Sequence, residues 1–308
     1  MFNLLVRNNW IWPKYRLPGC STYNHRHLVE LKLPNQIRGS LIEHLERLER
    51  KIKKAICDSH PISIIRVSDG EGYFLKEQTF GNIGKRHFLS QNTAKIDYPK
   101  WKERLEENDE ICFDLVWSLR RIYKDILSNQ KKNLRWEYCP FDVIYAEIAT
   151  RRFFSLTKNH KVGLIGAGAK LELIQNLLKY PEYRRYIGIE DFTQYIHVPQ
   201  RGACDEAEGV YRNIIDQIGD NPCDIYLVGM GIAKLYIQSQ LKKELQVSFL
   251  DIGCGLDALA GIIPNDKPFF GDWINYRIEG YNYKDIDFLS KKNPYVKDKV
   301  VYLQPKKE

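Results

Sequence analysis

Two acidic side chains, Asp69 and Glu71, follow an apolar stretch and are separated by a single glycine. A run of β-branched residues predicts a buried strand before them: Ile62, Ile64, Ile65 and Val67. Gly70 lets the backbone turn tightly enough for both carboxylates to face one hard divalent cation. The alternative is a solvated acidic turn, since a D-x-E triplet is expected about once in a chain of this length. Its position after a strand favours a metal site that holds a nucleotide pyrophosphate.

Two arginines are candidates for binding phosphate, because a guanidinium matches phosphate oxygens through two parallel hydrogen bonds. Arg66 lies three residues before Asp69, and it is expected either to contact a diphosphate or to pair with Glu71. Arg151 follows Thr150 at the end of an apolar helical stretch, so it is either a phosphate ligand or a cation at a helix C-terminus.

From Lys161 onward, short apolar strands alternate with amphipathic helices. Strands are predicted at residues 162–166, 186–189, 195–198, 224–229 and 247–251. Before them, helices are predicted from residue 40 to 57 and from 99 to 121. This alternation predicts an α/β fold with a Rossmann-like, mostly parallel sheet flanked by helices and with ligands at the carboxyl ends of its strands.

A glycine turn follows the predicted strand 162–166. Gly166 and Gly168 match the first two glycines of a dinucleotide-binding fingerprint, but Leu171 stands where the third is required. A dinucleotide cofactor is therefore not expected. The same turn still presents backbone N–H groups and a helix N-terminus, which together form a general anion site.

Three side chains are candidates for a general base. Asp251 and Asp257 lie near the carboxyl end of a predicted strand, where a carboxylate can take a proton from an acceptor hydroxyl. His197, after another short strand, is a further candidate with a structural role as the alternative.

The whole chain has the composition of a folded protein, with 308 residues and 44% hydrophobic content. Its net charge of +8 suits phosphate-bearing substrates but is too small to indicate nucleic acid binding. Seven scattered cysteines without a C-x-x-C pair fit a reducing cytoplasm, and no signal peptide or membrane-spanning segment is expected. Residues 1–39 are expected to form an irregular aromatic and basic arm, which either packs across the domain or makes peripheral membrane contact.

The order of the motifs resembles the GT-D fold glycosyltransferases. The resemblance covers about Ile62 to Gly261 and starts at an Arg-x-x-Asp-Gly-Glu element after a strand. Two weaker elements follow: a segment similar to Ala-x-x-Thr-Arg with one extra residue at 146–151, and a strand with a Gly-x-Gly turn at Gly229 and Gly231. A strand that ends in Asp-x-Gly follows at 251–253.

The resemblance implies a glycosyltransferase that uses a nucleotide-diphosphate sugar, with a UDP-sugar favoured, and a glycan or lipid-linked glycan acceptor. It implies Mn²⁺ or Mg²⁺ bound by the D-x-E carboxylates and no nucleic acid partner. Contacts with the donor are expected from the residues already named and from the two glycine pairs: Arg66, Asp69, Gly70, Glu71, Arg151, Gly166, Gly168, Gly229 and Gly231. The expected domain covers residues 61–290, between an N-terminal arm and helix at 1–60 and a basic tail at 291–308.

Two other functions remain open at this point. Residues 250–255, Leu-Asp-Ile-Gly-Cys-Gly, resemble the first motif of class I methyltransferases, which bind S-adenosylmethionine. In those enzymes the motif follows the first strand, whereas here only 53 residues come after Gly255. The other alternative is a non-catalytic assembly protein that binds a sugar nucleotide.

Overall fold

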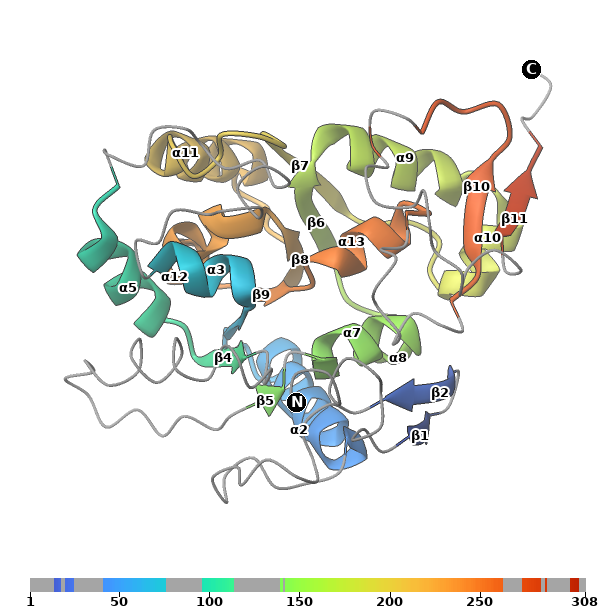
Figure 1. Cartoon of the computed structure of the whole chain (residues 1–308), viewed down its shortest axis with the longest axis horizontal. Helices are drawn as coiled ribbons and strands as arrows, with labels where there is room; N and C mark the ends of the chain where they lie inside the picture. The colour runs from blue at the N-terminus through green and yellow to red at the C-terminus, as the bar shows by residue number, and fades with distance from the viewer. Residues whose placement is uncertain are drawn as a thin grey trace, which may run out of the picture.

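The computed structural model describes residues 14–17, 20–24, 41–75, 96–113, 139–140, 142–262, 273–283, 286 and 300–304. These residues contain a large parallel β-sheet with helices on both of its faces (Figure 1). The α/β fold that the sequence predicts is therefore confirmed.

The sheet has seven strands among the described residues, and all neighbours in it run parallel. Their order is β5-β4-β3-β9-β8-β6-β7. The bounds are β3 (Ser63–Val67), β4 (Glu110–Phe113), β5 (Cys139–Pro140), β6 (Val162–Ala167), β7 (Gln194–Val198), β8 (Ile225–Gly229) and β9 (Ser248–Asp251). Strands covered on both faces are apolar nearly throughout, and β3, β6 and β9 are buried at every position.

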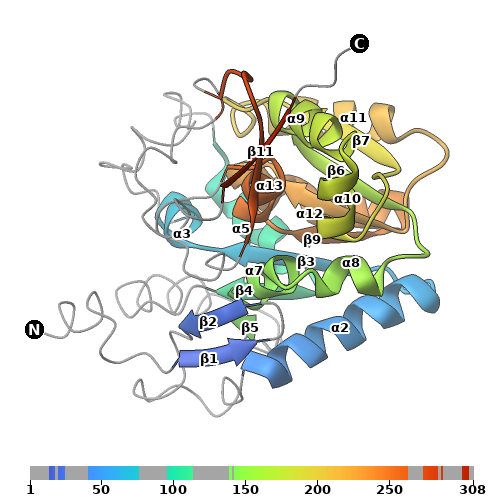
Figure 2. The same cartoon turned by 90° about the vertical axis from the view of Figure 1, so that its right-hand side faces the viewer.

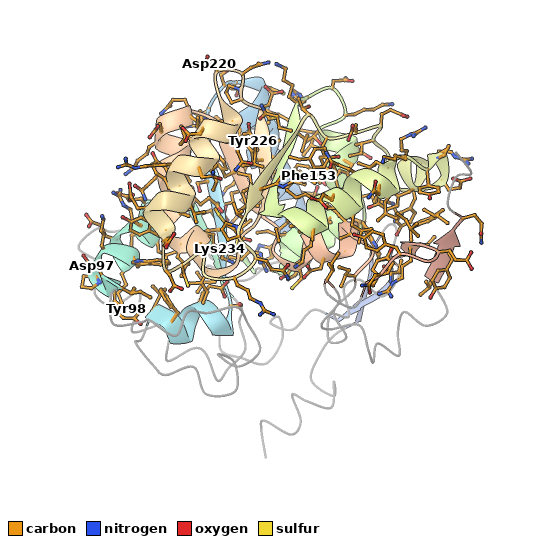
Figure 3. The ribbon with its side chains drawn as sticks, turned by 90° about the horizontal axis from the view of Figure 1, so that it is seen from above. Asp97, Tyr98, Phe153, Asp220, Tyr226 and Lys234 are labelled. Atoms are coloured by element: carbon orange, nitrogen blue, oxygen red, sulfur yellow. The ribbon has the colours of Figure 1, made fainter. Side chains whose placement is uncertain are left out.

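The helices form two layers on opposite faces of the sheet (Figure 1), and each layer has its own core. Figure 2 shows the same arrangement after a quarter turn. One layer contains α2 (Leu41–Cys57), α7 (Asp142–Ala149), α8 (Arg152–Leu156), α9 (Gly168–Leu178), α10 (Pro181–Ile187) and α13 (Cys254–Leu259). The other contains α3 (Asp69–Leu75), α5 (Tyr98–Glu106), α11 (Ala207–Ile218) and α12 (Lys234–Leu245). Phe153 in the first core and Tyr226 in the second lie inside the molecule, whereas Asp220 lies at its edge (Figure 3).

The chain reverses its direction across the sheet at β6. From β6 it moves outward to β7, then returns past β6 to β8 and continues to β9. The helix after β6, α9, covers one face, while the helix after β8, α12, covers the other. In open α/β sheets, ligands bind where helices diverge in this way, at the carboxyl ends of the two strands.

Two small sheets lie outside the main one. β1 (Lys14–Leu17) pairs antiparallel with β2 (Cys20–Asn24), so the segment expected to be an irregular arm contains one short strand pair. β10 (Asn275–Ile278) pairs parallel with β11 (Val300–Leu303). In addition α2, from the expected N-terminal segment 1–60, contributes Leu45, Leu48 and Ile52 to the core beneath the main sheet.

Two predicted elements are wrong, the first of them in part. The helix expected over 99–121 is present but ends at Glu106, because the Asn108 side chain donates to the carbonyls of Arg104 (3.2 Å) and Leu105 (2.9 Å), and residues 110–113 pair with β3 as a strand. Residues 114–121 lie outside the described residues. No strand forms at 186–189: residues 186 and 187 end α10, which has Pro181 at its start and a positive φ of 88° at Gly188 after its last turn.

Candidate functional site

Arg66 and Glu71 flank the end of β3, and both are buried. The segment after β3 is the first turn of α3 rather than the glycine-flanked turn that the sequence predicts. Glu71 turns back toward the strand, where its Oε2 accepts hydrogen bonds from the Ser68 backbone N–H (3.1 Å) and from the Ser68 hydroxyl. Asp69 begins the helix, but its side chain lies outside the described residues.

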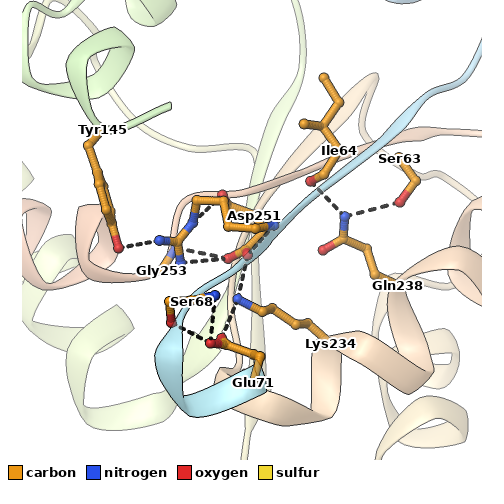
Figure 4. Close-up of polar contacts among 10 residues, drawn as sticks. Ser63, Ile64, Ser68, Glu71, Tyr145, Lys234, Gln238, Asp251 and Gly253 are labelled. Carbon is orange, nitrogen blue, oxygen red and sulfur yellow. Dashed lines mark hydrogen bonds and ion pairs between the residues drawn. The ribbon is translucent and has the colours of Figure 1, made fainter. Parts of the chain in front are cut away.

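Lys234 connects Glu71 to Asp251, the last residue of β9. Its ammonium lies 2.7 Å from Glu71 Oε1 and 2.6 Å from Asp251 Oδ2, and its side chain is only 2% exposed (Figure 4). Arg66 approaches Asp251 from β3: Nη2 lies 3.2 Å from Oδ1, and Nε donates to the Asp251 carbonyl at 3.0 Å. We call Arg66, Glu71, Lys234 and Asp251 the charge cluster. With two cations and two anions, it is neutral overall.

Tyr145 and Gly253 complete the surroundings of Arg66. The Arg66 guanidinium donates to the Tyr145 hydroxyl and lies over the tyrosine ring, 4.5 Å from its centre. Gly253 has a φ of +44°, and a Cβ there would collide with the guanidinium, so only glycine leaves room for Arg66. Its N–H donates to Asp251 Oδ1 at 3.0 Å.

Two members of the charge cluster, Glu71 and Arg66, and the neighbouring Tyr145 have shifted pKa values. Burial alone would raise the pKa of Glu71, but the Lys234 ammonium, Ser68 and Arg66 outweigh it and lower this pKa to about 2. Burial opposes the charge of Arg66, yet Asp251 raises its pKa above the usual value. The pKa of Tyr145 is well above its usual value because the hydroxyl is buried. Glu71 and Arg66 therefore stay ionised through the physiological range.

The glycines predicted to bind the donor lie at the carboxyl ends of β6 and β8. Gly166 and Gly229 are partners in the sheet, and a Cβ on either would meet the side chain of Leu256 from α13, at 2.8 Å in the case of Gly229. The close packing of α13 against the sheet is thus one reason why both positions are glycine. Gly168 begins α9, and Gly231 has a φ of +58° in the short 3₁₀ helix η4 (Gly231–Ala233) before α12.

The motif similar to that of methyltransferases forms β9, a turn and α13. Its glycines have structural partners: a Cβ on Gly253 would strike Arg66, and a Cβ on Gly255 would meet Ile252 at 3.1 Å. The space beside these two glycines is therefore occupied by side chains of the chain itself.

The remaining candidates lie apart from the charge cluster. Asp257 Oδ1 forms an ion pair of 2.5 Å with Lys170 of α9. His197 is exposed on β7, separated from β9 by β8 and β6, and its ring would be 3.0 Å from a Cβ on Gly168. Arg151 has a left-handed backbone (φ 59°), and its guanidinium lies over the ring of Tyr186 at 4.6 Å.

The roles of general base and phosphate ligand stay predictions. Asp251 is fully buried between two cations, so in this arrangement it serves as their counterion. The structure thus brings together Arg66, Glu71 and Asp251 from the predicted set. Gly70 lies beside them in α3, and a Cβ there would meet no other atom within 4 Å.

Sequence reasoning missed Lys234 and Tyr145, and it placed Gly253 in two motifs without predicting its contact with Arg66. A signal for Lys234 was present, since it lies in the apolar segment Ile-Ala-Lys-Leu-Tyr-Ile directly after a glycine turn. A lysine placed among apolar residues is expected to need an anionic partner.

The donor set of the charge cluster does not fit a metal ion in this arrangement. Both oxygens of Glu71 already accept hydrogen bonds or ion pairs from Lys234 and Ser68. Across the residues that the structure describes, no three His, Cys, Asp or Glu side chains gather in a way that would hold a metal. In the same part of the chain, no helix is long and apolar enough to cross a bilayer.

Comparisons with protein-family models, with curated proteins and with solved structures found no match. The parallel sheet, its reversal at β6 and the charge cluster are therefore the observations on which a function is proposed.

Proposed function

We propose that this chain is a glycosyltransferase that moves a sugar from a nucleotide-diphosphate sugar to a glycan or lipid-linked glycan acceptor, with a UDP-sugar favoured. The observation that carries the proposal is the convergence of two features at one edge of the sheet. The Arg-x-x-Asp-Gly-Glu element leaves the carboxyl end of β3, and the turns at Gly168 and Gly231 leave the carboxyl ends of β6 and β8. Ligands of open α/β sheets bind at this edge.

The chemistry of the edge suits a diphosphate leaving group. Departure of a nucleoside diphosphate develops negative charge on phosphate oxygens, which preorganised cations and N–H groups stabilise. The N-terminus of α9 presents such N–H groups at Gly168 and Ala169. Lys170 follows on the same helix, and its side chain is 18% exposed beside Asp257. These groups would bind the diphosphate, while the charge cluster holds α3 and β9 together.

The first experiment is a thermal-shift panel with UDP-, GDP- and dTDP-sugars and S-adenosylmethionine, each in Mn²⁺ or in EDTA. We expect one sugar nucleotide to raise the melting temperature and to be turned over with a glycan acceptor. Stabilisation by S-adenosylmethionine alone would instead support a methyltransferase, and binding of a sugar nucleotide without turnover an assembly protein. The predicted dependence on Mn²⁺ or Mg²⁺ is read from the same panel.

A pair of variants tests the position of the site. Asp69→Ala removes the carboxylate at the start of α3, and we expect it to lower turnover at least tenfold while the protein stays folded. Asp58→Ala is the matched control, because Asp58 is an exposed acidic residue after α2 and away from the strand ends. Wild-type turnover by a folded Asp69→Ala protein would refute the proposal.

A further inference from the structure

Two carboxylates from distant parts of the chain point at a single position in the charge cluster. Glu71 Oε1 comes from α3 and Asp251 Oδ2 from the end of β9. Both lie within 2.7 Å of the Lys234 nitrogen, at 2.7 and 2.6 Å (Figure 4). Two carboxylates that converge in this way are the usual setting for a divalent cation, which takes oxygen ligands at about 2.0–2.6 Å. Here an ammonium from the chain occupies that position.

The other carboxylate oxygens are also engaged. Glu71 Oε2 accepts from the N–H and the hydroxyl of Ser68. Asp251 Oδ1 accepts from the backbone N–H of Gly253 (3.0 Å) and from Arg66 Nη2 (3.2 Å). Asp251 Oδ2 also accepts from the backbone N–H of Arg66 (3.0 Å). No oxygen of the pair therefore faces an open position.

The charges and the burial of the charge cluster also disfavour a divalent ion. Arg66 and Lys234 balance Glu71 and Asp251, and these four side chains are at most 10% exposed. A divalent ion added to this set would leave two positive charges uncompensated in a buried site, which is costly. Expulsion of Lys234 would require a buried lysine on the first turn of α12 to find a new anion.

We propose that Lys234 is the built-in cation of this site and that Glu71 is its counterion rather than a metal ligand. Lys234 then acts as a positioning residue: it fastens the first turn of α3 to the end of β9 and makes this junction independent of divalent ions. The inference concerns the site of the proposed function but not its reaction. Its test uses no sugar nucleotide, so failure of the inference and failure of the proposed function are distinguishable.

The experiment measures Mn²⁺ binding to the full chain by equilibrium dialysis. We expect wild type and Glu71→Gln to have the same affinity for Mn²⁺, whether that affinity is zero or comes from other residues. Lys234→Met uncovers the two carboxylates, so we expect it to bind Mn²⁺ at least tenfold more tightly than wild type. The double variant Lys234→Met/Glu71→Gln should lose this gain, because only one carboxylate remains.

The matched control is Lys170→Met, which uncovers the single carboxylate of Asp257 and should gain no comparable Mn²⁺ affinity. Tenfold or greater weakening of Mn²⁺ binding by Glu71→Gln would overturn the inference, because Glu71 would then be a ligand. A folded Lys234→Met protein that gains no Mn²⁺ affinity would overturn it as well. If Lys234→Met does not fold, the comparison of wild type with Glu71→Gln still decides, since that variant keeps the lysine.

Discussion

Two buried glutamates in this molecule have opposite pKa shifts. Glu71, in the charge cluster, has a pKa lowered to about 2, whereas Glu147, on α7 in the other helical layer, has a pKa raised to about 8. Both residues are removed from water, with 8% of the whole Glu71 residue and none of Glu147 exposed. Burial acts on both in the same direction, so the difference must come from their partners.

The partners explain the difference. Glu71 accepts from Lys234 and Ser68, while neither carboxylate oxygen of Glu147 has a hydrogen-bond partner among the described residues. Burial is the main cause of the raised pKa of Glu147, and the nearby Glu49 adds to it. Arg152 acts in the opposite direction, but its side chain donates to Glu49. The ionised form of a buried carboxylate is thus stabilised where a cation pairs with it. It is destabilised where the cation nearby pairs with another carboxylate.

The largest effect is expected from the pH dependence of Glu147. Its pKa is about 8 in the folded state against 4.5 for the free group, so the folded state holds the proton more tightly. The contribution of Glu147 to stability is therefore greatest below pH 4.5 and is lost as pH rises through 8, by roughly 5 kcal/mol in total. Glu147→Gln should remove this loss, as measured by urea unfolding at pH 5, 7 and 9.

Glu172→Gln is the control for this experiment, because Glu172 is exposed on α9 and should keep the wild-type pH dependence. If the free energy of unfolding of Glu147→Gln depends on pH as steeply as that of wild type, Glu147 must have a partner in the folded protein. The contrast with Glu71 would then be smaller than described.

The next largest effect on the free energy of unfolding is expected in the charge cluster, where the buried carboxylates are paired. Asp251→Asn keeps the shape of the side chain but takes the counterion from both Arg66 and Lys234. Removing one member of a buried ion pair costs about 3–5 kcal/mol, and we expect the free energy of unfolding at pH 7 to fall by about 4 kcal/mol. Asp257→Asn, at the partly exposed pair with Lys170, should cost only about 1 kcal/mol. Equal losses in the two variants would show that the burial of the charge cluster contributes nothing.

The sequence predicted part of this arrangement. The rule that ligands gather at the carboxyl ends of parallel strands put Arg66, Glu71 and Asp251 at one edge of the sheet. The sequence did not predict which strands are neighbours. β3 and β9 pair across about 185 residues, and apolar strands carry little information about their partners. From the sequence, Arg66 was expected to contact either a diphosphate or Glu71, five residues along the chain. Asp251, its direct partner in the fold, was not indicated.

Other details depended on tertiary contacts. Residues 110–113 look helical beside the apolar residues that follow, but they become β4 because β3 offers them backbone partners. Gly253 looked like part of a cofactor motif, whereas the folded chain uses its missing side chain to admit Arg66. The sequence alone does not tell whether a glycine makes room for a cofactor or for a side chain of the same chain. Only the folded structure shows which group occupies the space that a Cβ would fill.

Among the buried carboxylates, the smallest effect is expected from Glu71 in acid. Its pKa of about 2 in the folded state lies below the ordinary 4.5, so its contribution is fully present above pH 4.5 and is lost as pH falls toward 2. The loss corresponds to roughly 3 kcal/mol. Glu71→Gln should be less stable than wild type at pH 7 and should lose less stability than wild type between pH 5 and pH 2, as measured by urea unfolding. The sign is opposite to that of Glu147, whose contribution is lost toward alkaline pH, so a common direction for both variants would show that burial and not pairing controls these two carboxylates.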